Sequence, residues 1–209
     1  MLITASFFIF STDGILTLVA SVLGVTALIL CAKGNPLGQL LMVIFSILYG
    51  IISFSFAYYG EMITYLGMSG PMALLSLISW LKNPYNGKKS EVKVNRVGGK
   101  EIVFMLVLSA VVTLGFYFIL EYFNTANLIF STFSVTTSFI AVYLTFRRSP
   151  YFALVYALND VVLIVLWTYA AIYNISYLSV IICFVVFLFN DLYSFTSWKR
   201  MQRRQKAEE

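Results

Sequence analysis

The chain has 209 residues, of which 60% are hydrophobic and 11% are charged, and it carries a formal net charge of +5. A soluble domain of this size carries about 25% charged residues, so the composition excludes an ordinary soluble protein. The apolar residues form runs of about 20, the length that an α-helix needs to cross a bilayer core. The sequence therefore predicts an all-α, multi-pass membrane protein with a single transmembrane domain over residues 1–209.

Seven apolar runs follow one another along the chain. Residues that end or start helices separate them, such as Gly34 and Pro36 after the first run and Pro150 before the sixth. Residues 1–12 are too short for a further span and lack the basic start of a cleaved signal peptide. The predicted spans are 14–32, 37–58, 62–81, 101–121, 126–146, 151–173 and 176–198.

The positions of the positive charges predict how the spans are oriented in the membrane. All 14 Lys and Arg residues fall in four segments, namely Lys33, residues 82–100, residues 147–148 and residues 199–206. With seven spans these segments share one side of the membrane, and the opposite side carries no basic residue. Basic loops stay in the cytoplasm during insertion, which predicts an N-terminus outside and a cytoplasmic tail at 199–209. The same charges suit contact with the lipid bilayer, so nucleic acid is not an expected partner.

Predicted runs three and seven end in the same short motif. Residues 76–80 and residues 194–198 both read S-x-x-S-W, and both close a run on the basic side. Trp80 and Trp198 are expected to anchor at the membrane interface, where indole rings are favoured. Runs one to three and five to seven look like parallel copies, with run four as a linker, which is a known transporter plan. The predicted parts are a first three-helix bundle at 14–81, a linker helix at 101–121 and a second bundle at 126–198.

Two Asn-Asp pairs lie well inside predicted spans. Asp160 and Asp191 both lie roughly 10–15 Å from the basic side, at 1.5 Å per residue. A carboxylate at mid-span costs about 2.5–3.5 kcal/mol, and no Lys, Arg or His lies inside a predicted span to pair with it. Because such acids normally face a cavity or the bundle interior, Asn159-Asp160 and Asn190-Asp191 predict a binding site. The alternative is interhelical hydrogen bonding that merely holds the bundle together.

Further polar and aromatic residues extend this candidate site. Trp167 shares a helix face with the first acid and lies too deep to be an interfacial anchor. Residues 131–138 hold six hydroxyl groups, including that of Thr137, and run two adds Gln39 and Tyr49. Together these groups suit a small, flat, polar ring compound that carries positive charge.

The chain resembles the PnuC family of bacterial vitamin transporters over nearly its whole length. The similar stretches are SWLKNP (79–84), EVKV (91–94), NDVVLIVLW (159–167) and the terminal ND…W segment. The resemblance implies a fold similar to that of the SWEET sugar transporters, a 3+1+3 topology, a homotrimer and a location in the bacterial plasma (inner) membrane. No cofactor is implied.

The resemblance also implies a substrate and a mode of transport. The usual cargo of the family is nicotinamide riboside, a pyridinium cation taken up by facilitated diffusion and trapped by a cytoplasmic kinase on the way to NAD. The family site combines Trp and Asn residues, which correspond here to Trp167, Asn159 and Asn190. Gln39 and Tyr49 are further substrate-binding candidates.

Several alternatives stay open beside this reading. Relatives carry thiamine or riboflavin, so another B vitamin is an alternative substrate, and the two Asp residues suggest proton coupling as an alternative mechanism. A membrane enzyme is disfavoured because no nucleophile–base pair, metal cluster or phosphate-binding loop is visible. Cys31 and Cys183 show no metal-ligand spacing. The prediction is therefore a transporter rather than an enzyme, with a structural scaffold as the remaining alternative.

Overall fold

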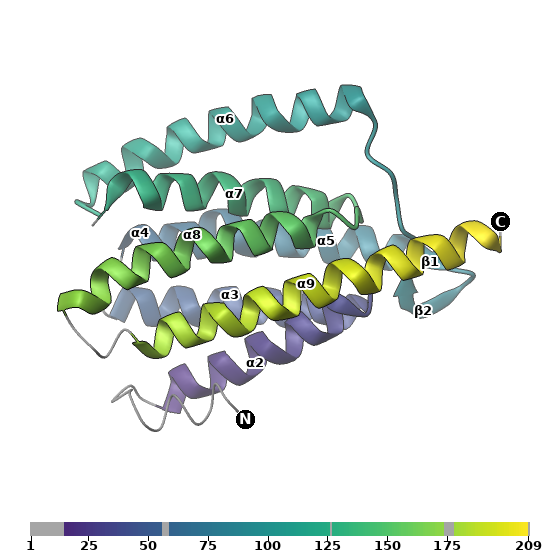
Figure 1. The fold of residues 1–209 in the computed structure, drawn as a ribbon, viewed down its shortest axis with the longest axis horizontal. Helices are drawn as coiled ribbons and strands as arrows, with labels where there is room; N and C mark the ends of the chain where they lie inside the picture. Colours follow the sequence, from purple (N-terminus) through teal and green to yellow (C-terminus); the bar gives the residue numbers. More distant parts are fainter. Residues whose placement is uncertain (1–14, 56–58, 126, 174–177, 209) are drawn as a thin grey trace.

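The fold is an elongated bundle of long helices with a small hairpin at one end (Figure 1). The structure is a computed structural model and describes residues 15–55, 59–125, 127–173 and 178–208. Its helices are α2 (Ile15–Ala32), α3 (Pro36–Ser55), α4 (Tyr59–Thr64), the π-helix η1 (Tyr65–Ser69), α5 (Gly70–Lys82), α6 (Gly99–Tyr122), α7 (Leu128–Phe146), α8 (Phe152–Tyr173) and α9 (Leu178–Ala207).

Among the described residues, six helical segments are long and apolar enough to cross a membrane, and the first helix adds a shorter apolar stretch at Val22–Ala32. Their outer faces carry large apolar side chains, such as Val103 and Val111 of α6, which are 62% and 63% exposed. The interior instead holds several buried amides, hydroxyls and carboxyls. The prediction of an all-α multi-pass membrane protein is confirmed. The six segments are Pro36–Ser55, Tyr59–Lys82, Gly99–Tyr122, Leu128–Phe146, Phe152–Tyr169 and Val180–Ala207.

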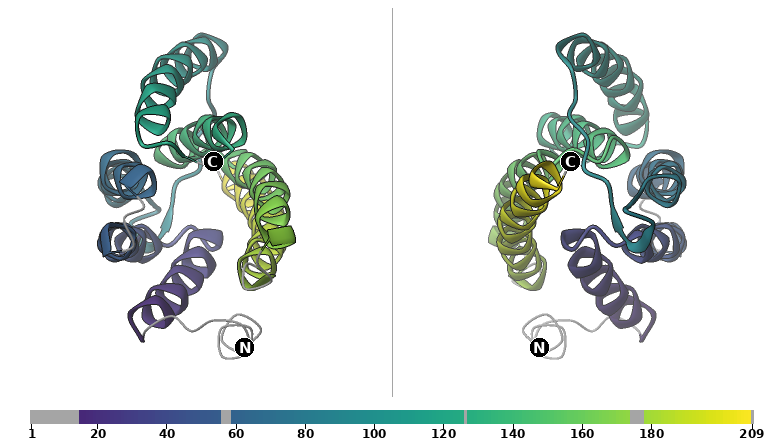
Figure 2. Two further views of the ribbon diagram at one scale, coloured as in Figure 1. Left: turned by 90° about the vertical axis from the view of Figure 1, so that its left-hand side faces the viewer. Right: turned by 90° about the vertical axis from the view of Figure 1, so that its right-hand side faces the viewer.

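The helices form two packed groups. In the first, α3 packs against α2 and α5, and in the second, α8 packs against α7 and α9. The groups meet where α2 contacts α9 and where α5 contacts α7. α6 packs chiefly against α7 and lies at the outer edge of the bundle when the molecule is viewed from its end (Figure 2).

The third span is interrupted by η1, which the sequence did not predict. The Gly70 N–H donates to the Tyr65 carbonyl, five residues earlier, and the next residue is Pro71, which has no N–H to donate. The wider turn sets the Tyr65 ring against the Tyr49 ring, with centroids 4.7 Å apart. The π-helix thereby shapes an aromatic cluster on the inner side of the first group.

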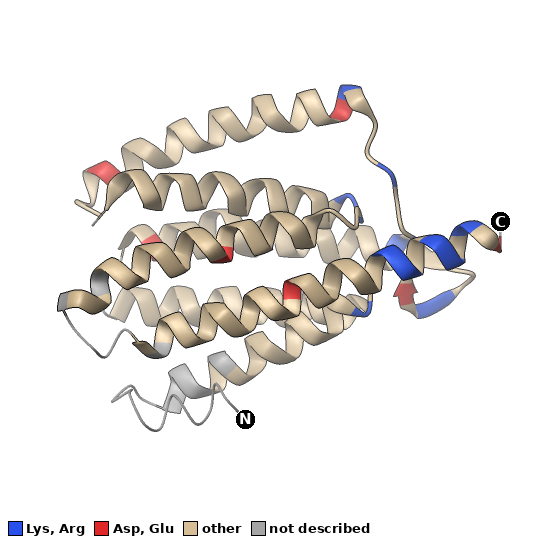
Figure 3. Ribbon diagram, viewed as in Figure 1, with Lys and Arg blue, Asp and Glu red and all other residues tan. Residues whose placement is uncertain are grey.

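The long polar loop folds into a hairpin of β1 (Pro84–Tyr85) and β2 (Lys88–Val92). Asn86 and Gly87 both have positive φ, at 46° and 75°, which is the backbone that a two-residue type I′ turn requires. Figure 3 shows that the hairpin lies at the end of the molecule where the basic residues gather. This end is called the basic end below.

The turns α2–α3 and α7–α8 are built alike. Gly34 and Arg148 both have positive φ, at 68° and 56°, and a proline follows two residues later in each case. Their N–H groups donate to the Cys31 and Thr145 carbonyls, each at 2.9 Å. The end of β2 and the segment after it bond both turns, because the Val92 N–H donates to the Gly34 carbonyl and the Asn95 N–H to the Arg148 carbonyl, each at 3.0 Å.

Trp80 and Trp198 meet in the centre of the basic end. Both are fully buried, and their ring centroids lie 5.3 Å apart. Trp80 Nε1 donates to the Thr145 carbonyl and Trp198 Nε1 to the Cys31 carbonyl, each at 2.9 Å. The expectation of interfacial anchors is wrong, because the indole N–H groups are satisfied inside the protein by the Thr145 and Cys31 carbonyls, each of which also accepts a backbone N–H of its own turn. Each group of helices thus donates one indole to the other.

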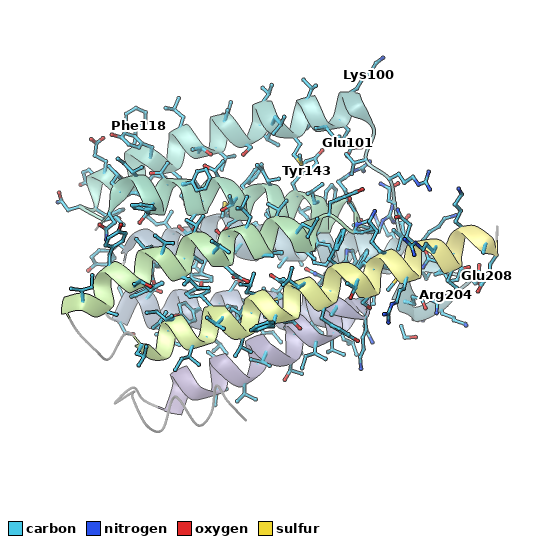
Figure 4. All side chains as sticks on the ribbon, viewed as in Figure 1. Lys100, Glu101, Phe118, Tyr143, Arg204 and Glu208 are labelled. Atoms are coloured by element: carbon cyan, nitrogen blue, oxygen red, sulfur yellow. The ribbon has the colours of Figure 1, made fainter. Side chains whose placement is uncertain are left out.

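α9 continues as a helix to Ala207, nine residues beyond the end of its predicted span. Its buried Gln205 donates from Nε2 to the Val92 carbonyl at 3.0 Å and accepts the Val94 N–H at 2.8 Å. Arg204 forms an ion pair with Glu91, and the Tyr85 hydroxyl donates to Glu208 at 2.6 Å. Figure 4 shows Arg204 and Glu208 beside the hairpin. These contacts are called the clasp, which consists of Tyr85, Glu91, Val92, Val94, Arg204, Gln205 and Glu208.

Gly38 allows the close approach of α3 to α2, and its replacement tests this packing. A Cβ at Gly38 would lie 2.6 Å from the Cys31 backbone nitrogen and 2.9 Å from the Ala27 carbonyl oxygen. Gly38→Ala is therefore expected to lower the free energy of unfolding by about 1–3 kcal/mol, measured by denaturant titration in detergent. Gly115→Ala is the control, because no heavy atom lies within 4 Å of its Cβ. Equal destabilisation by both changes would contradict this account.

Candidate functional site

Asp160 of α8 and Asp191 of α9 point into the bundle rather than toward lipid. They are 5% and 4% exposed, and their carboxyl groups lie close enough to interact directly. Within the described residues, Asp160 Oδ2 is buried without a hydrogen-bond partner. The predicted pair of interior acids is therefore brought together by the fold.

The amide of Asn159 joins α8 to α7. Its Oδ1 accepts a hydrogen bond from Ser134 Oγ at 3.0 Å and lies 2.7 Å from Thr137 Oγ1. Asn159 and Thr137 are both buried, so the amide and hydroxyl contact is shielded from lipid. The hydroxyl-rich part of α7 thus faces protein, and it places two predicted site residues side by side.

Asn190 is half-buried and lies next to the acids. Its Nδ2 donates to Asp191 Oδ1 at 3.4 Å, and its backbone carbonyl accepts from Ser194 Oγ at 2.8 Å. Asp191 and Trp198 share a face of α9, as their spacing predicted, and both are buried. The amide and carboxyl groups of this pair therefore lie about 10 Å from the tryptophan pair at the basic end.

Gln39 is the predicted site residue that α3, in the first group of helices, buries in this interior. Its buried Nε2 lies 3.2 Å from Cys31 Sγ, and Cys31 lies within electrostatic reach of Asp191. Tyr156, which the sequence analysis missed, interacts electrostatically with Asp191, Cys31 and Asp160. It stands one helical turn before Asp160, and this i, i+4 spacing on α8 was the available signal.

Tyr49 and Trp167 lie farther from this polar cluster. Tyr49 packs against Tyr65 and Phe45, with ring centroids 4.7 Å and 5.3 Å away. Tyr65, also missed by the sequence analysis, is within electrostatic reach of both Tyr49 and Tyr156 and so connects the aromatic cluster to the acids. Trp167 is half-buried on α8, about two turns beyond Asp160.

The interior polar cluster is separate from two surface pockets. One is an apolar groove of about 490 Å³ between α6 and α7, and the other is a pocket of about 480 Å³ at the basic end. Neither is lined by a predicted site residue. At the basic end, the buried tryptophan pair and Val92 of the clasp belong to one buried hydrophobic cluster.

Metal binding finds no support in the arrangement of ligand types. In the described part of the chain, no group of three or more His, Cys, Asp or Glu side chains could hold a metal ion. Cys31 and Cys183 are free thiols on different helices. The chemistry available in the interior is therefore hydrogen bonding by amides and hydroxyls together with attraction of positive charge by two carboxyl groups.

A bundle of apolar helices that encloses carboxyl groups without a cationic partner is the arrangement expected of a membrane transporter. Over residues 14–200 the chain matches the family model described as Nicotinamide mononucleotide transporter. The chain belongs to this family, which makes it a transporter rather than an enzyme and confirms the expected family.

Two known proteins are similar along nearly the whole chain. A nicotinamide riboside transporter PnuC from Neisseria mucosa is 26% identical over 211 residues, covering 99% of this chain and 80% of the relative. The crystal structure of a vitamin B3 transporter, PnuC, matches with a TM-score of 0.79 at 24% identity. This match covers 98% of the present chain and 90% of the other, so the two proteins share their fold.

The contact between Thr137 and Asn159 can be measured by a double-mutant cycle. Thr137→Val and Asn159→Ala are expected to couple by about 0.6 kcal/mol, and at most by about 1.7 kcal/mol, as interhelical hydrogen bonds in membranes do. The free energy of unfolding in detergent is measured for both single variants and the double variant. Thr168→Val replaces Thr137→Val in the control cycle, because Thr168 donates to the Ile164 carbonyl on its own helix. Coupling of equal size in both cycles would contradict a direct contact.

Proposed function

We propose that this protein carries nicotinamide riboside across the bacterial plasma membrane by facilitated diffusion. The observation that carries the proposal is the buried pair of Asp160 and Asp191, which no basic side chain within the spans can neutralise. A pyridinium ring supplies the missing positive charge. The relative named as a nicotinamide riboside transporter, which covers 99% of this chain, supports the same substrate.

The interior favours the riboside over the mononucleotide in the family's description. A phosphate group requires cationic side chains or free backbone N–H groups. The sequence has no Lys, Arg or His between residues 34 and 81, 102 and 146, or 149 and 198. Two carboxyl groups in the same interior would also repel a phosphate. A cationic riboside without phosphate therefore fits the charges better.

The site residues take different roles in this proposal. Asp160 and Asp191 attract the cationic ring, while Asn190 and Gln39 offer amides to the carboxamide and the ribose hydroxyls. Asn159 and Thr137 form the wall that holds Asp160 in place. Trp167 and Tyr49 provide aromatic faces on which the ring stacks along its path.

The 3+1+3 arrangement and the orientation belong to the same proposal. The matching turns at Gly34 and Arg148 and the reciprocal bonds of Trp80 and Trp198 support two related three-helix bundles, at 14–81 and 126–198. The peripheral place of α6 supports its role as a linker. The basic end would face the cytoplasm, as positively charged loops do, with the N-terminus outside. A homotrimer remains part of the proposal from the family resemblance.

Transport in this arrangement requires the basic end to open. We propose that the tryptophan pair and the clasp form the inner seal. The indoles join the two bundles directly, and the clasp joins α9 to the hairpin, whose strand β2 contacts α3 and α5. Rocking of one bundle against the other would separate the indoles and break both of their bonds to the Cys31 and Thr145 carbonyls. The conformation described here would then be the one closed toward the cytoplasm.

Charge-selective binding tests the role of the acids. Asp160→Asn and Asp191→Asn are each expected to weaken the binding of nicotinamide riboside about 10- to 100-fold, the loss typical of one charged hydrogen-bonding partner. The binding of the reduced, uncharged riboside is expected to change much less. Isothermal titration calorimetry on purified protein measures both ligands.

Glu121→Gln is the matched control, because Glu121 is an exposed acid at the end of α6. An equal loss of both ligands in the Asp variants would refute the charge argument. Tighter binding of thiamine or riboflavin than of the riboside would show that the other vitamin is the substrate. Uptake into proteoliposomes that follows an imposed pH gradient would replace facilitated diffusion by proton coupling.

Cys31 is a native reporter of the inner seal. In a Cys183→Ala background, an impermeant maleimide applied at the basic end is expected to label Cys31 slowly. Trp198→Ala is expected to raise the labelling rate at least about tenfold, because loss of a buried Trp removes about 3–5 kcal/mol of packing from the closed state. Gln205→Ala, which loosens the clasp without emptying the core, is expected to give a smaller increase.

Tyr193→Ala serves as the control for this labelling, since Tyr193 is 54% exposed on α9. Retained riboside binding shows that each labelled variant is folded. Unchanged labelling in both seal variants, with binding intact, would show that the seal lies elsewhere. That result would leave the substrate proposal standing, because the two experiments report on different residues.

A further inference from the structure

The pocket at the basic end has a composition that the transport proposal does not use. It lies between the segment after β2, the first turns of α6, the turn α7–α8 and the end of the membrane part of α9, with a volume of about 480 Å³. Its residues divide into an apolar floor and a polar rim. The floor is Val97, Ile102, Met105, Leu144 and Pro150, and the rim is Asn95, Arg96, Ser149, Tyr151, Lys199 and Gln202.

The rim carries positive charge without a matching acid. Arg96 and Lys199 line the pocket, and none of its lining residues is Asp or Glu. Lys199 Nζ lies 4.1 Å from the centroid of the Tyr151 ring and 3.4 Å from Gln202 Oε1, so two neutral groups hold the ammonium group at the pocket. The rim therefore offers a positioned cation that has no carboxylate partner among the described residues.

Glu101, the residue before the lining residue Ile102, is already neutralised. Glu101, in the first turn of α6, forms an ion pair with Arg147, whose Nη2 lies 2.9 Å from Glu101 Oε2. The Tyr143 hydroxyl lies 3.4 Å from the same carboxyl group, and Figure 4 shows Glu101 and Tyr143 at this side of the molecule. Glu101 thus leaves the charges of Arg96 and Lys199 uncompensated.

Arg148 adds a third uncompensated cation next to the pocket. Its carbonyl accepts the Asn95 N–H, and it precedes the lining residue Ser149. Its Nε and Nη1 are buried without an acceptor among the described residues. Burial and the neighbouring Arg147 lower the pKa of Arg148, as expected for a guanidinium without a counter-charge.

The floor continues onto the lipid-facing surface. Ile102 lines the pocket and is 42% exposed, and the adjoining Val103 and Phe104 of α6 are 62% and 58% exposed. The pocket therefore crosses the boundary between the apolar belt and the charged end. A ligand that fits it has a negative head beside an apolar tail, and such a molecule is already present in the membrane.

We propose that this pocket binds an anionic phospholipid, with the phosphate at Arg96 and Lys199 and the start of an acyl chain on the floor formed by Val97, Ile102 and Met105. Basic pockets between membrane helices are a recurrent form of headgroup site. The bound lipid touches the segment after β2, α6 and α9 at once. It therefore links α6 to α9, in addition to the packing of α6 against α7.

Lipid titration tests the site. Full-length protein in neutral detergent is titrated with phosphatidylglycerol, and the rise in the thermal unfolding midpoint gives the apparent affinity. Arg96→Gln is expected to weaken binding about fivefold, and Arg96→Gln with Lys199→Gln about thirtyfold, since each basic residue contributes a similar factor at a lipid surface. Arg96 is exposed, so the single variant is expected to fold normally.

Lys88→Gln with Lys89→Gln is the charge-matched control, because both lysines are exposed on the hairpin and outside the pocket. Unchanged affinity in this control, with the losses above in the pocket variants, supports the site. Equal weakening in control and pocket variants overturns it in favour of general surface attraction. An equal response to phosphatidylcholine removes the role of charge, and an equal response to inorganic phosphate removes the role of the lipid tail, so either result also overturns the proposal.

Discussion

Two carboxyl groups in a bilayer without a basic partner place a solvation constraint on the whole bundle. Asp160 and Asp191 cannot face lipid, so α8 and α9 must turn these residues inward, where each is at most 5% exposed. The neighbouring helices also bury side chains that can hydrogen-bond, such as Thr137 of α7 and Gln39 of α3. Polar groups are therefore enclosed by the bundle, beside its hydrophobic clusters, while large apolar side chains cover the outer faces.

Hydrogen bonding between buried groups also determines how the two bundles meet at the basic end. The Cys31 and Thr145 carbonyls at the ends of α2 and α7 each accept a backbone N–H of their own turn and, as a second bond, the indole N–H of Trp198 or Trp80 from the other bundle. The pattern is reciprocal, because each bundle donates one indole and accepts one. Separation of the bundles at this end would therefore break two hydrogen bonds and one aromatic contact together. Because these contacts are lost at the same time, we expect the end to open in one step.

The candidate site was partly accessible to sequence reasoning. A charged residue deep in an apolar run indicates an inward face by itself, and the Asn-Asp pairs together with the family resemblance added Asn159 and Asn190. Tyr65 was missed because a tyrosine in a chain with 14 of them carries no signal until its neighbours are known, whereas Tyr156 had only its i, i+4 spacing from Asp160 to mark it. The tryptophans were misplaced because an indole beside basic residues looks the same whether its helix end faces lipid headgroups or another helix end.

By itself the sequence determined the membrane class, the approximate helix boundaries, the clustering of positive charge and the need to bury two acids, because each follows from the local cost of polar groups in hydrocarbon. Tertiary structure decided which side chains meet across helices. The contacts of Trp80 with Trp198, of Gln39 with Cys31 and of Gln205 with the end of β2 join residues whose partners depend on the crossing and register of whole helices. No local rule fixes that register, because it results from packing summed over the entire bundle.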